Sequence, residues 1–446
     1  MTSEPRGNRG RKAVTTTSGS PNRRCVYGRG ADADGGPEPT RLARRLGLLD
    51  AVVIGLGAMI GAGVFAAAAP AADAAGSWLL AGLALAAAVA YCNATSSARL
   101  AARYPESGGT YVYGRERLGP FWGWLAGWAF VAGKTASCAA MALTFATYAA
   151  PDWGRPLAAA AVVAVTAANY RGIRSTALVT RAALAVVLVA LAAVVIGALA
   201  GGSASTGNLA GAGPMGIGGV LQSAGLLFFA FAGYARIATL GEEVADPART
   251  IPRAISLALG VAVAVYLVVL ASALLAAGPE ALAGSRFPLV TAVRAGDLDG
   301  LAGAVRVGGA VASLGVLLAL VAGVGRTAFA MGAGGDLPRW LATVHPVHRV
   351  PHRADLSVGA LVLAVVLVAD VRGAIGFSSF AVLAYYAVTN ASAWTLPPGD
   401  RRWPRALAGA GLAGCALLAL SLPSTSVVSG AGVLGVGALV WAVRRR

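Results

Sequence analysis

Long apolar runs alternate with short polar connections along the sequence after residue 45. One run, residues 182–200, carries no charged side chain at all. A membrane-spanning helix needs about 20 apolar residues, whereas a strand of a membrane barrel needs about 10. Lipid admits only helices and closed barrels as spanning forms. Runs of this length therefore predict an all-α membrane protein.

The pattern predicts about twelve transmembrane helices. We place them at residues 50–69, 76–98, 120–149, 156–170, 176–200, 218–240, 254–277, 303–330, 355–371, 374–396, 404–421 and 426–443. Composition agrees, because 57% of the 446 residues are hydrophobic, only 12% are charged and the mean hydropathy is +0.69. A soluble domain would carry about 25% charged residues.

The formal net charge of +17 is distributed as topology requires. Most Lys and Arg residues fall at one set of alternate helix ends, and the exceptions are Arg155, Arg286, Arg294, Arg306, Arg372 and the intrahelical Lys134. Positively charged loops stay in the cytoplasm. We therefore expect a multi-pass protein of the inner (plasma) membrane with both termini cytoplasmic, and no nucleic-acid partner. Residues 1–45 are predicted to be a disordered basic tail before a transmembrane domain at 46–443.

Two of the predicted spans contain helix-weakening glycines near the bilayer centre. The first span has Gly57, Gly61 and Gly63, and the sixth has Gly233 among small residues. Close helix packing through small residues is one interpretation. The other is that both helices unwind, as in an inverted repeat of five plus five helices. The repeats would cover about 50–200 and 218–396, with two further helices at 404–443.

Broken helices also suggest a ligand class. Free N–H groups at the start of a half-helix carry partial positive charge suited to a carboxylate. Free carbonyls at the end of the preceding half suit an ammonium group. A site that offers both favours a zwitterion, and an amino acid fits.

Three motifs resemble the amino acid–polyamine–organocation transporter superfamily. They are Gly57–Phe65, the loop Tyr104–Tyr113, and Phe228–Tyr234 followed by Glu242–Arg253. The segment Ile237–Glu243 is similar to the bacterial and cationic amino acid transporter branch. The resemblance implies a leucine-transporter-type fold.

The resemblance also assigns substrate-binding roles. The amides of Gly61, Ala62 and Gly63 would hold the substrate carboxylate, and the carbonyls of Met59, Phe229, Ala230 and Ala232 would surround its ammonium group. Phe229 takes the position of an aromatic gate in related exchangers, with ordinary packing as the alternative.

Two positions depart from the family pattern. Ala235 stands where many relatives carry Glu, and residues 182–200 lack the lysine that several relatives place in the fifth helix. Lys134, deep in the third helix, is the candidate replacement for coupling or for contact with the substrate side chain. A charge at the bilayer centre costs at least about 2.5 kcal/mol, so a functional role is the first hypothesis and snorkelling to an interface the second.

We therefore expect a secondary active amino acid transporter that works by proton-coupled symport with alternating access. Obligate exchange is the alternative, and a polyamine or organocation transporter or a non-transport membrane protein is less favoured. No cofactor, metal or enzymatic activity is expected. The proton is the expected coupling ion because Ser313 alone makes a weak case for sodium. Other polar positions could line a cavity or bridge helices, namely Ser223, Ser313, Thr327, Tyr385 and Asn390.

Overall fold

A computed structural model describes residues 46–104, 108–172, 177–209, 216–238, 240, 244–397 and 403–445. Helices make up nearly all of this part of the chain, and its one extended pairing is an isolated bridge between Leu46 and Val244. The all-α prediction is confirmed. The predicted tail at residues 1–45 lies outside the described residues, as do Glu242 and Glu243.

The helices follow the predicted order closely. The first half contains α1 (Leu48–Met59), α2 (Gly63–Ala75), α3 (Leu79–Arg103), α4 (Thr110–Arg117), α5 (Pro120–Ala149), α6 (Gly154–Tyr170) and α7 (Ala177–Ala200). The second half contains α8 (Ile217–Phe231), α9 (Ala235–Ala238), α10 (Pro247–Ala283), α11 (Pro288–Ala295), α12 (Ala302–Ala333), α13 (His352–Val368) and α14 (Val371–Trp394). Two more helices, α15 (Arg405–Leu420) and α16 (Ser424–Arg444), complete the fold.

Local sequence explains several of the helix starts. Pro120 opens α5 after Gly119, whose φ of +108° suits a residue without a side chain, and proline is favoured in a first turn. The Asp370 carboxylate caps α14 by accepting a hydrogen bond of 2.8 Å from the Gly373 amide. Pro247 opens α10, so the seventh span begins seven residues before the predicted start.

Eight helical stretches of the described residues are long and apolar enough to cross a membrane, and α1 and α15 are shorter apolar helices. The protein is therefore a multi-pass membrane protein. The count of twelve spans stays a prediction, because one of the eight stretches covers both α2 and α3, and α6 and α13, with 17 residues each, are not among the eight.

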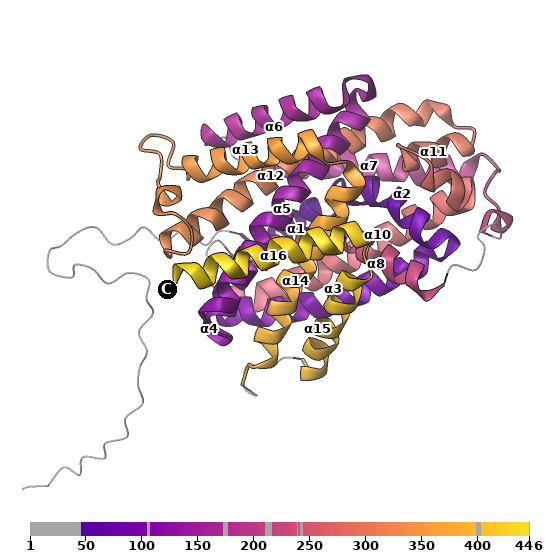
Figure 1. Cartoon of the computed structure of the whole chain (residues 1–446). Coiled ribbons are helices and arrows are strands. Elements are labelled where there is room, and N and C mark those ends of the chain that lie inside the picture. Colours follow the sequence, from indigo (N-terminus) through magenta and orange to yellow (C-terminus); the bar gives the residue numbers. More distant parts are fainter. Residues whose placement is uncertain are drawn as a thin grey trace, which may run out of the picture. The chain divides into compact units, whose positions relative to one another are not determined.

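The packing of the helices is reciprocal between the two halves. In the two halves α3 is equivalent to α10, α5 to α12 and α7 to α14. The contact of α3 with α8 is matched by that of α10 with α1, and the contact of α5 with α14 is matched by that of α12 with α7. Four further contacts join equivalent elements directly: α2 with α8, α3 with α10, α5 with α12, and α6 with α13, which lie side by side in Figure 1. A two-fold relation requires this exchange of partners. The short helices α4 and α11 also occupy equivalent places, so the structure supports the five-plus-five fold.

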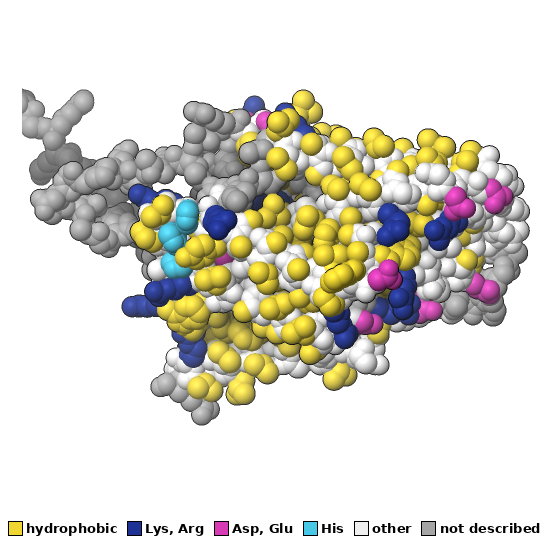
Figure 2. All heavy atoms as spheres, turned by 90° about the horizontal axis from the view of Figure 1, so that it is seen from above, with side chains coloured by type: hydrophobic (Ala, Val, Ile, Leu, Met, Phe, Trp, Pro, Cys, Tyr) yellow, Lys and Arg dark blue, Asp and Glu magenta, His cyan; other side chains and the backbone are white. Residues whose placement is uncertain are grey.

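The two ends of the helix bundle differ in charge. At one end, which we call the basic end, α3, α6, α12 and α16 end and α5 and α13 begin. Figure 2 shows the histidines and a group of basic side chains at one end, and most visible acidic side chains toward the other. The acidic residues at the other end include Asp73, Asp152, Glu280, Asp297, Asp299 and Asp370.

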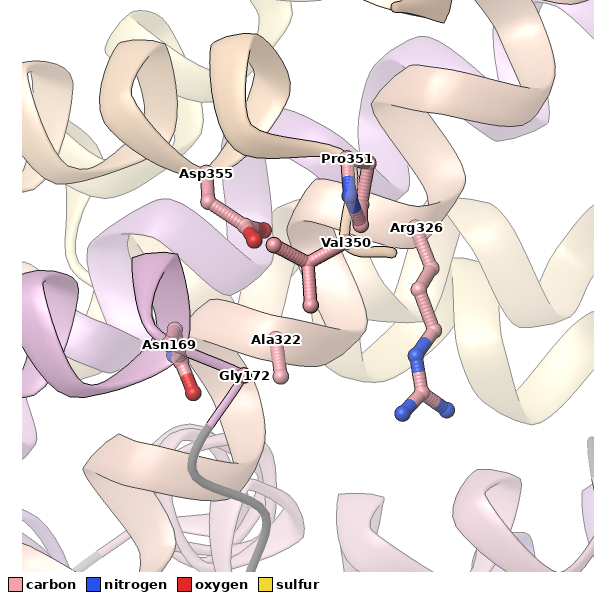
Figure 3. A pocket seen from close by; sticks show the side chains of 7 residues that line it. All are labelled: Asn169, Gly172, Ala322, Arg326, Val350, Pro351 and Asp355. Carbon is pink, nitrogen blue, oxygen red and sulfur yellow. The ribbon is translucent and has the colours of Figure 1, made fainter. Parts of the chain in front are cut away.

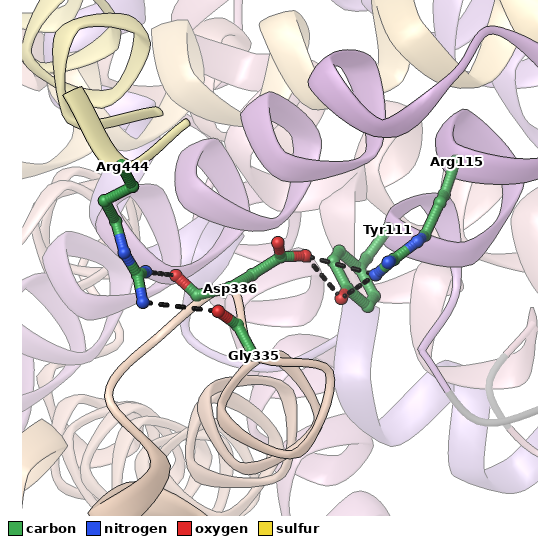
Figure 4. Close-up of polar contacts among 5 residues, drawn as sticks. All are labelled: Tyr111, Arg115, Gly335, Asp336 and Arg444. Atoms are coloured by element: carbon green, nitrogen blue, oxygen red, sulfur yellow. Dashed lines mark hydrogen bonds and ion pairs between the residues drawn. The ribbon is translucent and has the colours of Figure 1, made fainter. Parts of the chain in front are cut away.

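A polar network ties three elements together at the basic end (Figure 4). The Tyr111 hydroxyl donates to the Asp336 carboxylate at 2.6 Å, and the Arg115 guanidinium reaches the same carboxylate at 3.3 Å. Arg444 of α16 donates to the backbone carbonyls of Asp336 and, at 3.2 Å, Gly335. The network therefore joins α4 and α16 to the end of α12.

Candidate functional site

The first span is interrupted where the glycines predict. α1 ends at Met59, Ile60 has a non-helical ψ of 41°, and α2 begins at Gly63. The first amides of any α-helix lack partners within that helix. The predicted carboxylate-binding amides of Gly61, Ala62 and Gly63 therefore stand at the start of α2, where the helix dipole favours negative charge.

The sixth span is interrupted less than predicted. α8 ends at Phe231, a single 3₁₀ turn covers Ala232–Tyr234, and α9 continues from Ala235. The Ala232 amide donates to the Phe229 carbonyl, so this carbonyl is already engaged. The helix tightens here instead of unwinding into extended chain, because a 3₁₀ turn needs only a small change of ψ.

The two interruptions touch each other through their glycines. A Cβ on Gly63 would lie 2.6 Å from the Ala230 Cα, and one on Gly233 would lie 2.3 Å from the Ala58 carbonyl oxygen. A Cβ on Gly61 would lie 2.2 Å from Val316 of α12. The glycines therefore pack the two spans backbone to backbone, while only the first span is broken and the sixth is tightened into a 3₁₀ turn.

Two side chains bind the carbonyls expected to hold an ammonium group. The Tyr266 hydroxyl of α10 contacts the carbonyl of Met59 and, at 3.1 Å, that of Ala230. The Lys134 ammonium of α5 donates to the Ala232 carbonyl at 3.4 Å. Sequence reasoning missed Tyr266, although a lone tyrosine in the apolar seventh span was an available signal.

Lys134 lies at the centre of the protein. Its side chain is only 6% exposed, and its ammonium group contacts the interruption of the sixth span, not a group at either end of the helix bundle. This position favours a central role over snorkelling. The Ala232 carbonyl, one of those expected to hold a substrate ammonium group, is thus bound by a side chain of the protein.

The aromatic residues of the sixth span divide by exposure. Phe228 and Phe231 are fully buried, and they pack on Tyr386 and Tyr266 with ring centroids 5.8 Å and 5.2 Å apart. Phe229 is only partly buried. It is therefore the most exposed of these three phenylalanines, and its role as a gate stays a prediction.

Comparison with known proteins agrees with this architecture. The family model described as amino acid permease matches residues 46–442. The chain belongs to this family. It is therefore a membrane transporter of the amino acid–polyamine–organocation superfamily and not an enzyme.

Relatives of this permease carry several substrate names. An uncharacterized transporter of Mycobacterium tuberculosis is 61% identical over 407 residues, which cover 91% of this chain and 92% of the relative. A methylthioribose transporter of Bacillus subtilis is 30% identical over 77% of each chain. A branched-chain amino acid permease of the same organism is 28% identical over 72% of this chain and 74% of its own.

The remaining polar candidates of the permease mostly bond within or between helices. Ser313 and Thr327 donate to carbonyls of their own helix, Gly309 at 2.7 Å and Gly323 at 3.2 Å. Tyr385 accepts from the Thr110 amide at 3.1 Å. For these three, helix bridging and backbone bonding describe the structure better than cavity lining does.

Asn390 and Ser223 differ from those three. The Asn390 amide donates to Asn93 of α3 at 2.6 Å, which links the second and tenth spans. The Ser223 hydroxyl is buried without a hydrogen-bond partner and lies near Gly82 of α3. Asn390 therefore bridges helices, and Ser223 is held close to the backbone of a neighbouring span.

The three histidines His345, His348 and His352 surround one aromatic ring. Their ring centroids lie 5.2 to 6.2 Å from that of Tyr170 at the end of α6. The His345 Nδ1 atom accepts hydrogen bonds from the amides of Val347 and His348. The cluster therefore fastens the loop before α13 to the end of α6.

Proposed function

We propose that the chain is a secondary active transporter that moves neutral amino acids across the inner (plasma) membrane by proton-coupled symport. Both termini would be cytoplasmic, so the basic end would face the cytoplasm. The observation that carries the proposal is the meeting of two interrupted spans at Gly63 and Ala230. Amides at the start of α2 suit a carboxylate. The carbonyls of Met59 and Ala230 accept from Tyr266, and each keeps a second lone pair for an ammonium group.

The relatives support this substrate class without fixing it. One relative is named for branched-chain amino acids and another for methylthioribose, which is not an amino acid. The preference for neutral amino acids comes from Lys134. A zwitterion brings a carboxylate that offsets its ammonium group, whereas a cationic side chain would add an uncompensated positive charge near that of Lys134.

Lys134 would couple proton movement to transport. The protonated side chain ties α5 to the sixth span through the Ala232 carbonyl. Loss of the proton removes the charge from this hydrogen bond and weakens the tie, since charge-assisted bonds are the stronger ones. The sixth span could then move relative to α5. Proton release would thereby favour one of the two states between which a transporter alternates.

Contacts at the basic end would have to break when the site opens to the cytoplasm. Leu46 pairs with Val244, and the Ala245 amide donates to the Leu46 carbonyl at 3.0 Å, which connects the start of the first span to the loop after the sixth. Arg181 of α7 forms an ion pair with Asp50 of α1. Both contacts involve the first span, so its α1 half is the element we expect to move.

The direct test is uptake by the full-length protein in proteoliposomes, with a radiolabelled mixture of the twenty proteinogenic amino acids as the probe. We expect saturable uptake that an inward proton gradient accelerates. Uptake that requires internal amino acid would indicate obligate exchange. Absence of both uptake and exchange, in vesicles where the same preparation transports methylthioribose, would refute the amino acid assignment.

A further inference from the structure

A second buried charge lies away from the interrupted spans, in a small cavity near the basic end. Asp355, in the first turn of α13, is 3% exposed, and its Oδ1 atom has no hydrogen-bond partner. It is the only carboxylate among the buried polar side chains of the described residues. An unpartnered buried oxygen is costly, so this group calls for a ligand.

The cavity provides space for that ligand. Its volume is about 30 Å³, and a single water molecule needs roughly 10–15 Å³ of such space. Asn169 of α6, Ala322 and Arg326 of α12, and Val350 line it together with Asp355 (Figure 3). The site can therefore hold water beside the carboxylate, and water is the usual carrier of a proton to a buried acid.

The chain makes room for this carboxylate. A Cβ on Gly325 would lie 1.9 Å from the Asp355 Oδ1 atom, so any other residue at position 325 would displace the acid. Figure 3 shows the Asp355 carboxylate pointing into the cavity and the Arg326 guanidinium directed away from it. The carboxylate is thus positioned by packing and not held in a close ion pair with Arg326.

The surroundings favour a proton over a metal cation. Sodium would need several oxygen ligands, whereas Asp355 contributes the one carboxylate among the residues that line the cavity. A proton needs only a single oxygen. Burial disfavours the charged form of the Asp355 carboxyl group. The positive end of the α13 dipole and the charge of Arg326 favour the charged form.

Several other charged or titratable groups lie on elements packed against α13 at this end. They are Tyr170 and Arg171 of α6, Arg339 of the η6 turn (Arg339–Ala342), His345, His348 and Arg349 of the preceding loop, and His352 and Arg353 of α13 itself. Lys134 is the titratable group of α5, and it lies deeper, in the middle of that helix. Any pH effect must therefore be assigned to Asp355 by a signal specific to a carboxyl group.

α12 connects this acid with the substrate site. Gly325, against Asp355, and Val316, against Gly61, are nine residues apart on that helix, or about 14 Å at 1.5 Å per residue. A change in charge at Asp355 therefore acts on the helix that packs on the first interruption. We propose that Asp355 binds a proton through the water-sized cavity, as a second proton site of the transport cycle. This inference rests on the proposed function.

Infrared difference spectroscopy of the full-length protein in liposomes tests proton binding directly, with the pH as the only variable. The 19 Asp and Glu residues all contribute to the C=O band of protonated carboxyl groups as the pH is lowered, and we expect one component of this band to be lost in Asp355→Asn. Asp299→Asn is the matched control, because Asp299 is exposed in a surface ion pair with Arg294, and it should keep that component. Gly325→Ala should shift or remove the component without changing any charge.

Transport measurements then test coupling. With the radiolabelled mixture of twenty amino acids, Asp355→Asn should lose about tenfold in proton-gradient-driven uptake and in substrate-driven proton entry, while exchange stays within about twofold. An Asp355→Asn spectrum with the same carboxyl components as the unmodified protein would overturn the site, and unchanged proton entry would overturn its part in coupling. If the unmodified protein neither takes up nor exchanges amino acids, the proposed function fails, and with it the coupling, whereas the infrared band still decides proton binding.

Discussion

Gly63 of α2 lies against Ala230 of α8 so closely that a Cβ on the glycine would stand 2.6 Å from the Ala230 Cα. The contact brings together two positions 167 residues apart in sequence, each at the interruption of its span. Since the first span is broken here and the sixth is tightened, the contact defines where a small ligand could meet two sets of peptide dipoles. Substitutions that add volume at this contact should therefore affect transport first.

We predict that Gly233→Ala abolishes most uptake and lowers stability by about 1–3 kcal/mol, the usual cost of overpacking. The added methyl would meet the Ala58 carbonyl, which is backbone and cannot rotate away. Gly218→Ala is the control in the same span, because nothing lies within 4 Å of its Cβ position. Thermal unfolding and initial uptake rates would measure both effects, and equal behaviour of the two variants would contradict the prediction.

Lys134→Met should remove the proton dependence of uptake and slow gradient-driven uptake by at least about tenfold. The reason is that methionine keeps much of the side-chain volume but binds no proton and donates no hydrogen bond to the Ala232 carbonyl. Lys134→Arg separates charge from proton exchange, since arginine stays protonated at any working pH. Initial rates across a series of external pH values provide the measurement. A Lys134→Met variant with the original pH profile would end the coupling role.

Tyr266→Phe should weaken substrate binding and lower stability by about 0.5–1.5 kcal/mol, the net contribution of a typical hydrogen bond. The hydroxyl contacts the carbonyls of Met59 and Ala230 and so fixes both interruptions in one geometry. Tyr170→Phe, at the end of α6, loses the same atom away from the site. Competition binding with the amino acid mixture would report the change in affinity. An affinity that matches the Tyr170→Phe control would show that this geometry does not depend on the hydroxyl.

Much of the fold follows from local sequence. The apolar runs placed α5 at its observed bounds, and the glycines at 61 and 63 marked the first interruption. The short helices α4 and α11 were not predicted, because each has eight residues and no apolar run of spanning length. Their existence depends on packing against the spans, which local periodicity does not encode.

The candidate site was predictable only in part. Glycines and a buried lysine are visible in sequence, so the breaks and Lys134 could be singled out. The partners of the carbonyls could not be, because Tyr266 and Lys134 reach them from other helices. Sequence alone does not show that Asp355 is buried either. It is the fourth residue of α13, directly after a basic loop, and this position is typical of an exposed side chain. Only the placement of Gly325 against it reveals that it is buried.

Tyr111→Phe should lower the stability of the protein by about 1–2 kcal/mol, since its hydroxyl donates to the Asp336 carboxylate and bonds to charged groups are stronger than neutral ones. The neighbouring Tyr113→Phe provides a matched control, because the Tyr113 hydroxyl is buried without a partner and its removal relieves a desolvated polar group. Thermal unfolding in detergent at low and high salt would compare the two. The Tyr111 effect should shrink at high salt, because the network is partly exposed and salt screens its charges. A larger loss for Tyr113→Phe than for Tyr111→Phe would mean that the network at the end of α12 does not stabilise the fold.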